Sequence, residues 1–157
     1  MNKKIIALLV VVALATTGAF AFGIGGMYSN VTGGNGGALT FGLDRSGPYF
    51  GVGLDNYGIN VSAEYQLWRY DFVNTGVFDI GFHAGAGANV ALDLFNGAFG
   101  IGAGVYGLGG LHLEIDLDFV EVEFFGQWQP KAFMWFLPFA FDMNWWGGAA
   151  SGVRFWF

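Results

Sequence analysis

Hydrophobic and polar residues alternate with a period of two along most of the chain after residue 21, which is the pattern of β-strands. In the clearest run, 99–118, one face is apolar and the other carries glycine together with Tyr106, His112 and Glu114. Similar runs are separated by turn signals such as Asn74-Thr75-Gly76. Together they predict eight strands, with approximate spans 22–30, 37–45, 48–56, 59–71, 77–94, 98–116, 119–136 and 146–157.

The number and length of these strands favour a closed barrel that crosses a membrane. A tilted spanning strand needs about 9–11 residues, and bacterial barrels use an even number of strands from eight upward. Closure pairs every backbone group, which a sheet in hydrocarbon requires. We therefore expect an all-β fold, an eight-stranded antiparallel up-and-down transmembrane β-barrel over 22–157.

Composition sets the orientation of the two strand faces. The chain has 28 glycines, 19% aromatic residues and 11% charged residues, against about 25% charged residues in an average soluble domain. An eight-stranded barrel encloses little volume. Large side chains are therefore expected to face lipid, while glycine and the few charged residues face the lumen. Tyrosine and tryptophan near the strand ends fit interfacial girdles.

The first residues predict export. Lys3 and Lys4 precede an apolar run from Ile5 to Ala15, and Ala19-Phe20-Ala21 supplies small residues at a cleavage site. This is the layout of a secretory signal over 1–21, with 22–157 as the remaining domain. The formal net charge of −6 argues against nucleic acid as a partner, since such binding needs basic residues to neutralise phosphates.

The last strand carries the most specific resemblance. Val153, Phe155 and Phe157 alternate up to an aromatic final residue, which resembles the terminal signature of outer-membrane barrels. With Phe22-Gly23-Ile24-Gly25 and Phe99-Gly100-Ile101-Gly102, the chain resembles short eight-stranded outer-membrane barrels without an assigned function. It is more distantly similar to the transmembrane domain of outer-membrane protein A and to OmpW-like barrels. The resemblance implies the bacterial outer membrane, contact with its lipids, and recognition by the barrel-assembly machinery.

Polar side chains on the lumen-facing positions form the first candidate site. A narrow lumen needs such groups to be paired, and Arg154 is expected to pair with Glu121 or Glu123 from the neighbouring strand. An ion-selective path is the alternative, because rings of acidic residues favour cations. The candidate residues are Glu64, Asp79, His83, His112, Glu114, Glu121, Glu123 and Arg154.

We expect no metal site, cofactor or catalytic centre. His112, Glu114, Asp116 and Asp118 offer hard ligands for calcium, but they lack the glycine and spacing of an EF-hand, and alternate strand residues project along a line. The serines after residue 21 include no G-x-S-x-G setting. A Ser62, His83 and Asp79 arrangement would depend on geometry that the sequence does not supply.

The segment 130–146 is unusually aromatic for an outward loop, and it allows two interpretations. It either extends the last two strands into an upper aromatic girdle, or it offers a hydrophobic surface to a lipid, an apolar small molecule or a protein partner. The residues concerned are Phe133, Trp135, Phe136, Phe139, Phe141, Trp145 and Trp146.

The expected function is a structural or surface role for a small barrel with a closed or nearly closed polar lumen. A narrow pore, or a conduit for small hydrophobic molecules along 130–146, is the alternative, and binding of a host or envelope partner is the second. The lumen face is uneven: glycines gather on the third, fifth and sixth strands, whereas Gln66, Trp68, Phe125 and Trp156 lie on others. Either large side chains fill the glycine side, or a channel runs along it.

Overall fold

The computed structural model describes residues 21–30, 35–95 and 99–157, and this part of the chain is all-β. No helix in it is long and apolar enough to cross a membrane. The predicted signal segment 1–21 lies outside the described residues, apart from Ala21. The strands are β1 (Gly23–Ser29), β2 (Gly36–Gly42), β3 (Tyr49–Leu54), β4 (Gly58–Asn74), β5 (Phe78–Asp93), β6 (Gly100–Asp116), β7 (Glu121–Trp128), β8 (Lys131–Leu137), β9 (Phe139–Asn144) and β10 (Ala149–Trp156).

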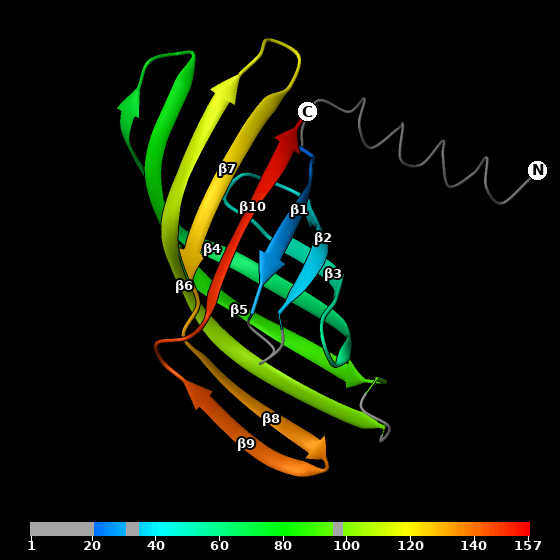
Figure 1. The fold of residues 1–157 in the computed structure, drawn as a ribbon. Coiled ribbons are helices and arrows are strands. Elements are labelled where there is room, and N and C mark those ends of the chain that lie inside the picture. Colours follow the sequence, from blue (N-terminus) through cyan, green and yellow to red (C-terminus); the bar gives the residue numbers. More distant parts are fainter. Residues whose placement is uncertain (1–20, 31–34, 96–98) are drawn as a thin grey trace, which may run out of the picture.

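The strands close into a ring of eight antiparallel positions (Figure 1). β1 to β6 pair in chain order, β6 pairs with β7, β7 with β10, and β10 returns to β1. β8 follows β7 along the same edge of β6, so the two occupy one barrel position. β9 pairs only with β8 among the described strands. The predicted eight-stranded antiparallel barrel is therefore confirmed.

The two ends of the barrel differ in what they carry. The end that we call the terminal end holds Phe22, Phe157 and the turns 43–48, 75–77 and 117–120. Backbone hydrogen bonds between Phe22 and Phe157 join the first and last strands there. The loop end is opposite and holds the connection 55–57, Leu94 and Phe95, and the turn of the β8–β9 hairpin at Pro138. In Figure 1 the terminal end is at the top.

The chain between the last two predicted strands differs from the prediction. The span 119–136 is interrupted after Trp128, where Pro130 has no N–H to give to the ladder, although its carbonyl still accepts from Gly107 N at 3.0 Å. The chain then turns at Pro138 and returns as β9, instead of passing directly into a strand at 146. The final strand begins at Ala149, so an additional hairpin stands where the sequence predicted an outward loop.

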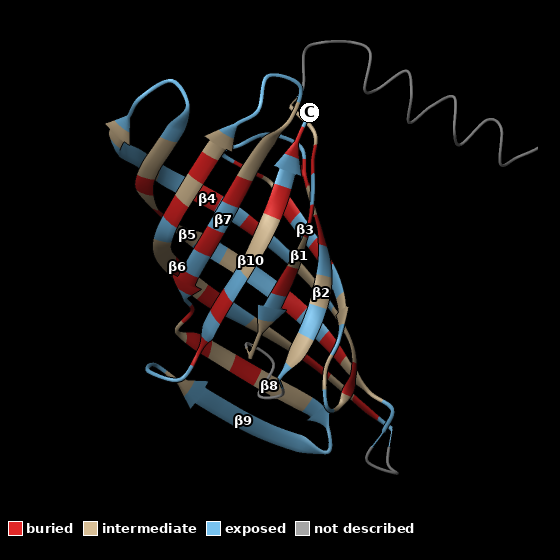
Figure 2. Cartoon of the chain, turned by 45° about the horizontal axis from the view of Figure 1, so that its top comes forward, coloured by how far each residue is buried: buried red, intermediate tan, exposed pale blue. Residues whose placement is uncertain are grey.

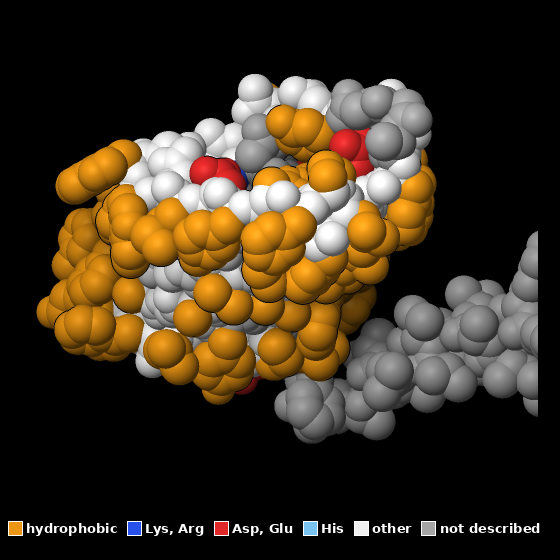
Figure 3. Space-filling view, turned by 90° about the horizontal axis from the view of Figure 1, so that it is seen from below, with side chains coloured by type: hydrophobic (Ala, Val, Ile, Leu, Met, Phe, Trp, Pro, Cys, Tyr) orange, Lys and Arg blue, Asp and Glu red, His pale blue; other side chains and the backbone are white. Residues whose placement is uncertain are grey.

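Burial alternates along the strands as the pattern predicts, and Figure 2 shows the alternation clearly on β7 and β10. Large apolar side chains such as Leu39, Val52, Val105 and Leu111 point outward and are more than half exposed. In Figure 3, which views the molecule from below, hydrophobic side chains cover much of the visible surface. The side chains with the least exposure, among them Trp156, Arg154, His83 and Glu123, all point into the lumen.

β4 departs from strict alternation at two places. β4 carries irregularities between Gln66 and Trp68 and between Asp71 and Val73, each of which inserts a residue without a partner on β5. The first moves Trp68 to the outer face, where it is 64% exposed, and turns Arg69 inward. The expectation that Trp68 faces the lumen is therefore wrong, and the bulge is the physical reason.

Large side chains fill the glycine-lined parts of the lumen. A Cβ on Gly87 would stand 2.5 Å from the ring of Tyr106, and one on Gly102 or Gly104 would stand 2.5 Å from the ring of Phe133. At the other side of the barrel, a Cβ on Gly42 would stand 2.5 Å from Trp156. Of the two interpretations of the uneven lumen, these contacts favour filling by side chains.

Candidate functional site in the lumen

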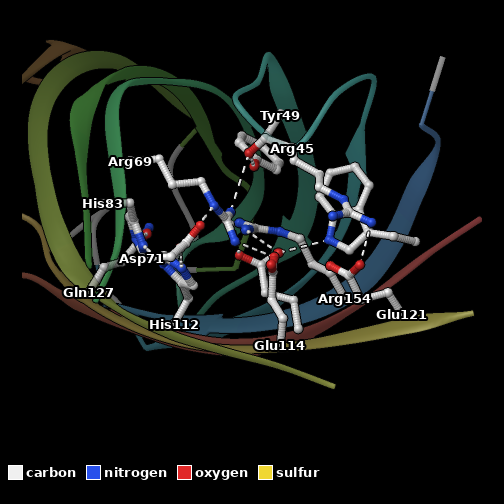
Figure 4. A network of polar contacts seen from close by, with 12 residues as sticks. Arg45, Tyr49, Arg69, Asp71, His83, His112, Glu114, Glu121, Gln127 and Arg154 are labelled. Carbon is white, nitrogen blue, oxygen red and sulfur yellow. Dashed lines mark hydrogen bonds and ion pairs between the residues drawn. The ribbon is translucent and has the colours of Figure 1, made fainter. Parts of the chain in front are cut away.

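Charged and polar side chains from β4, β5, β6, β7 and β10 converge in the middle of the lumen (Figure 4). Alternation turns most of these groups inward while the apolar residues face outward, and the bulge in β4 turns Arg69 inward as well. The network has three parts, centred on Glu123, on Glu64 and on the pair His83 and His112.

Glu123 is the centre of the first part and is fully buried. Its Oε2 accepts from Arg154 Nη1 at 3.3 Å and from the indole Nε1 of Trp156 at 3.0 Å. Its Oε1 accepts from Arg69 Nη1 at 3.5 Å. A buried carboxylate is tolerated only when it is paired and hydrogen-bonded, and here three donors satisfy it.

Arg154 is held by aromatic rings as well as by carboxylates. Its guanidinium carbon lies 4.1 Å from the ring centroid of Tyr49 and 3.9 Å from that of Phe125, so the cation lies between two π faces. Its Nη2 is 4.0 Å from Glu64 Oε2. Only a glycine at position 25 leaves room for this side chain, because a Cβ there would stand 2.9 Å from Arg154 Cγ.

Glu64 is the centre of the second part, toward the loop end. Its Oε1 accepts from the hydroxyl of Tyr106 at 2.9 Å and from Gln129 Nε2 at 3.0 Å. Gln127 Nε2 donates to Oε2 at 3.3 Å. All four residues are buried, so neutral donors supply most of the solvation that this carboxylate would otherwise take from water.

His83 and His112 connect the Glu64 part of the network by hydrogen bonds to Asp71, which lies nearer the terminal end. His112 Nε2 lies 2.7 Å from Asp71 Oδ1, and the Nδ1 atoms of His112 and His83 lie 3.4 Å apart. His83 Nε2 lies 3.0 Å from Gln127 Oε1. Because Gln127 also donates to Glu64, one chain of hydrogen bonds runs from Asp71 through both imidazoles to Glu64.

Ion pairs continue the network toward the terminal end. Arg69 Nη2 pairs with Glu114, and Arg45 pairs with Glu121. A cavity of about 170 Å³ opens beside these groups and is also lined by Asp79. At the loop end a smaller cavity of about 30 Å³ is lined by Glu64 and Tyr106, which is enough for one or two water molecules.

The tightly packed layer between the two cavities excludes solvent. Glu123 is 0% exposed, Arg154 1%, Trp156 2%, Tyr49 2% and Phe125 5%. Arg154 thus meets Glu123, one of the two partners expected for it. The predicted lumen residues divide by place: Glu64, His83, His112, Glu114, Glu123 and Arg154 lie in the network, while Glu121 and Asp79 line the terminal-end cavity.

Several members of the network were not predicted from the sequence. Arg69 was missed because the bulge at Leu67 reverses the phase of β4, and no turn residue marks that bulge. Tyr106 and Gln127 sit on the lumen phase of their strands, so alternation alone could have found them. Lys131 follows the break at Pro130, is 5% exposed, and donates to the carbonyl of Asn30 at 3.3 Å.

The β8–β9 hairpin divides the aromatic segment between two faces. Phe133 is buried inside, and Trp135 packs against it and against Tyr57, with ring centroids 5.1 and 5.9 Å apart. The remaining aromatic residues of the candidate set are exposed: Phe136, Phe139 and Phe141 on the hairpin, and Trp145 and Trp146 in the turn that follows it.

The C-terminal strand shows the alternation of the predicted assembly signal. Val153, Phe155 and Phe157 point outward, and Phe157 is 65% exposed, while Arg154 and Trp156 point into the lumen. β10 is paired on both sides, with β1 and with β7. The strand therefore closes the barrel and contributes both charge and aromatic bulk to its interior.

The candidate metal and catalytic arrangements are not assembled. Among the described residues, no group of three or more His, Asp and Glu side chains is placed to hold a metal ion. His112 and Glu114 point inward to Asp71 and Arg69, whereas Asp116 and Asp118 lie at the turn beyond β6. His83 makes its hydrogen bonds with His112 and Gln127 rather than with Ser62 or Asp79.

Comparison with protein-family models, with curated proteins and with solved structures found no match. The fold and the lumen geometry therefore carry the functional argument alone.

Proposed function

We propose that the protein is a small integral outer-membrane barrel with a structural or surface role and a sealed polar lumen. The observation that carries this proposal is the solvent-excluded layer around Arg154 and Glu123, which separates the two cavities. A conducting pore needs hydrated polar groups along its length. Here the charges are instead paired and stacked against Tyr49, Phe125 and Trp156.

The membrane location is supported by the outer surface. Large apolar side chains are exposed around the barrel, and a closed sheet is one of the two structures that satisfy every backbone group in hydrocarbon. The predicted signal segment 1–21 and the outward Val153, Phe155 and Phe157 point to the outer membrane and to the assembly machinery as a partner. In this orientation the terminal end faces the periplasm. Lipids are the main partners, with no role for nucleic acid and no catalytic activity.

A solute-flux measurement tests the sealing directly. The full chain is expressed with its own N-terminus, its recovery with outer membranes is measured, and the purified barrel is placed in liposomes. We expect recovery in the outer-membrane fraction and no swelling in small sugars. A matched double variant, Tyr49→Ala with Phe125→Ala, removes both rings from Arg154 and should permit swelling. Swelling by the unmodified protein contradicts the sealed lumen, and recovery as a soluble protein contradicts the location.

The β8–β9 hairpin supports a second candidate function, the binding of an apolar molecule or an envelope partner. Phe139 is 77% exposed and Trp146 is 88% exposed, and β9 has a free edge within the described sheet. Tryptophan quenching in liposomes separates the two roles of this hairpin. Protection of Trp145 and Trp146 from an aqueous quencher by lipid alone favours an aromatic girdle. Protection that appears only with an added fatty acid favours binding.

A further inference from the structure

The barrel has walls of very different height. The short wall, as we call it, consists of four neighbouring strands, β3, β2, β1 and β10, with 6, 7, 7 and 8 residues. The tall wall consists of β4, β5 and β6, with 17, 16 and 17 residues. Pairing between β3 and β4 covers only Ile59–Glu64 of β4, so the tall wall continues beyond its neighbour at the terminal end (Figure 1).

Strand geometry converts these lengths into heights. With a rise of about 3.3 Å per residue and a tilt of about 40°, seven residues span about 18 Å along the barrel axis and seventeen span about 43 Å. The apolar band of an outer-membrane barrel is about 25 Å tall. At β2 and β3 the short wall therefore falls below the band by about 7 Å, whereas the tall wall exceeds it.

On β2 and β3 the apolar surface of the short wall ends at or within one residue of the strand ends. Outward side chains run from Leu43, directly after β2, to Leu39 on β2, and from Phe50 to Leu54 on β3, and these four are between 44% and 61% exposed. Polar residues follow at both ends of these two strands. Asp44, Arg45 and Ser46 are exposed at the terminal end, and at the loop end Asn56 is exposed and Asp55 is half-buried.

We infer that the lipid bilayer is held at reduced thickness beside β2 and β3 of the short wall. This inference rests on the proposed membrane location, and it specifies the bilayer thickness that matches the apolar surface of the barrel. Asp44 at one end and Asn56 at the other must keep their water, because moving them into hydrocarbon costs more than deforming lipid. Tilting the barrel does not remove the mismatch, since lowering one end of this wall out of the hydrocarbon drives the other end into it.

Single-cysteine labelling tests the inference, because the chain has no native cysteine. Nitroxide labels are placed at Leu43→Cys and Leu54→Cys at the two ends of the short wall and at Leu39→Cys between them. Val105→Cys on the tall wall reports insertion, and Asn56→Cys reports full contact with water. Access to oxygen and to a water-soluble nickel reagent is measured in phosphatidylcholine vesicles with 12-carbon and with 18-carbon chains.

We expect the Leu43 and Leu54 labels to keep nickel access close to that of Asn56 in both lipids, while the Leu39 and Val105 labels favour oxygen. A loss of nickel access at Leu43 or Leu54 in the 18-carbon lipid, with Val105 still favouring oxygen, overturns the thinning and leaves the membrane location intact. Nickel access at Val105 equal to that at Asn56 overturns the membrane location, and this inference with it.

Discussion

Arg154 shows at the scale of one residue how the lumen tolerates charge. Its guanidinium is 1% exposed, and it faces Glu123 from one direction and two aromatic rings from the others. Glu123 in turn depends on cations, because Arg154 and Arg69 are its two charged partners. Removing one member therefore leaves a buried charge incompletely compensated, which costs more than the pair contributes.

Replacing Arg154 with leucine is expected to lower the free energy of unfolding by about 3–5 kcal/mol, because Glu123 keeps only Arg69 as a cationic partner. Urea titration in detergent micelles measures the change. The double variant Arg154→Leu with Glu123→Gln should recover part of the loss, since it no longer buries an unpaired carboxylate. Unchanged unfolding of the single variant contradicts the role of this pair.

Glycine at a single position decides whether a side chain fits inside. Gly110 and Gly109 are adjacent on β6 but face opposite sides. A Cβ on Gly110 would overlap the carbonyl oxygen of Gly126 and stand 2.7 Å from Gln127 Cα, whereas one on Gly109 would meet nothing within 4 Å. Backbone atoms cannot rotate away as the end of a side chain can.

The Gly110→Ala substitution is expected to destabilise the barrel by about 1–3 kcal/mol through overpacking. Gly109→Ala is the matched control and should change stability by no more than about 0.5 kcal/mol. Thermal unfolding of the two variants in the same detergent gives the comparison. Equal effects of the two substitutions would show that the inward face is not packed as described.

At the scale of elements, the sequence predicted more of the regular strands than of their irregularities. Alternation placed β1 to β6 close to their observed bounds, because a half-buried strand needs a period of two. It failed at Leu67 and at Pro130–Ala149. The bulge in β4 adds one unpaired residue and has no mark in the amino-acid composition. The apolar run Phe139–Met143 forms a strand that pairs with β8, but its sequence would also fit an extension of β10.

A comparison of substitutions at Trp68 and Trp156 tests the effect of the β4 bulge. Strict alternation places Trp68 and Trp156 inside, but Trp68 is 64% exposed and packs edge-on against Phe82, at 5.5 Å between ring centroids. Trp156→Ala should cost about 3–5 kcal/mol of unfolding free energy, as for other buried aromatic residues. Trp68→Ala should cost only about 0.5–1.5 kcal/mol, the contribution of one aromatic pair. Equilibrium unfolding in detergent distinguishes them, and a reversed order contradicts the bulge.

At the scale of the whole molecule, the abundant glycine and aromatic residues are parts of one packing arrangement. The rings of Tyr106, Phe133 and Trp156 pack against glycines of other strands. These rings fill the part of the lumen where a channel would otherwise run. The sequence predicted a closed or nearly closed polar lumen, but it left open whether large side chains fill the glycine side or a channel runs along it. Closure depends on which side chains reach across the barrel, and that is set by register and by the bulge that turns Arg69 inward.

Single-channel recording in a planar lipid bilayer tests the sealed lumen most directly. The unmodified barrel is expected to insert without discrete conductance steps. The Tyr49→Ala, Phe125→Ala variant, in which the rings around Arg154 are gone, should give reproducible steps and so verify that inserted barrels are detected. Reproducible steps from the unmodified protein, at the level of the variant, would contradict the account.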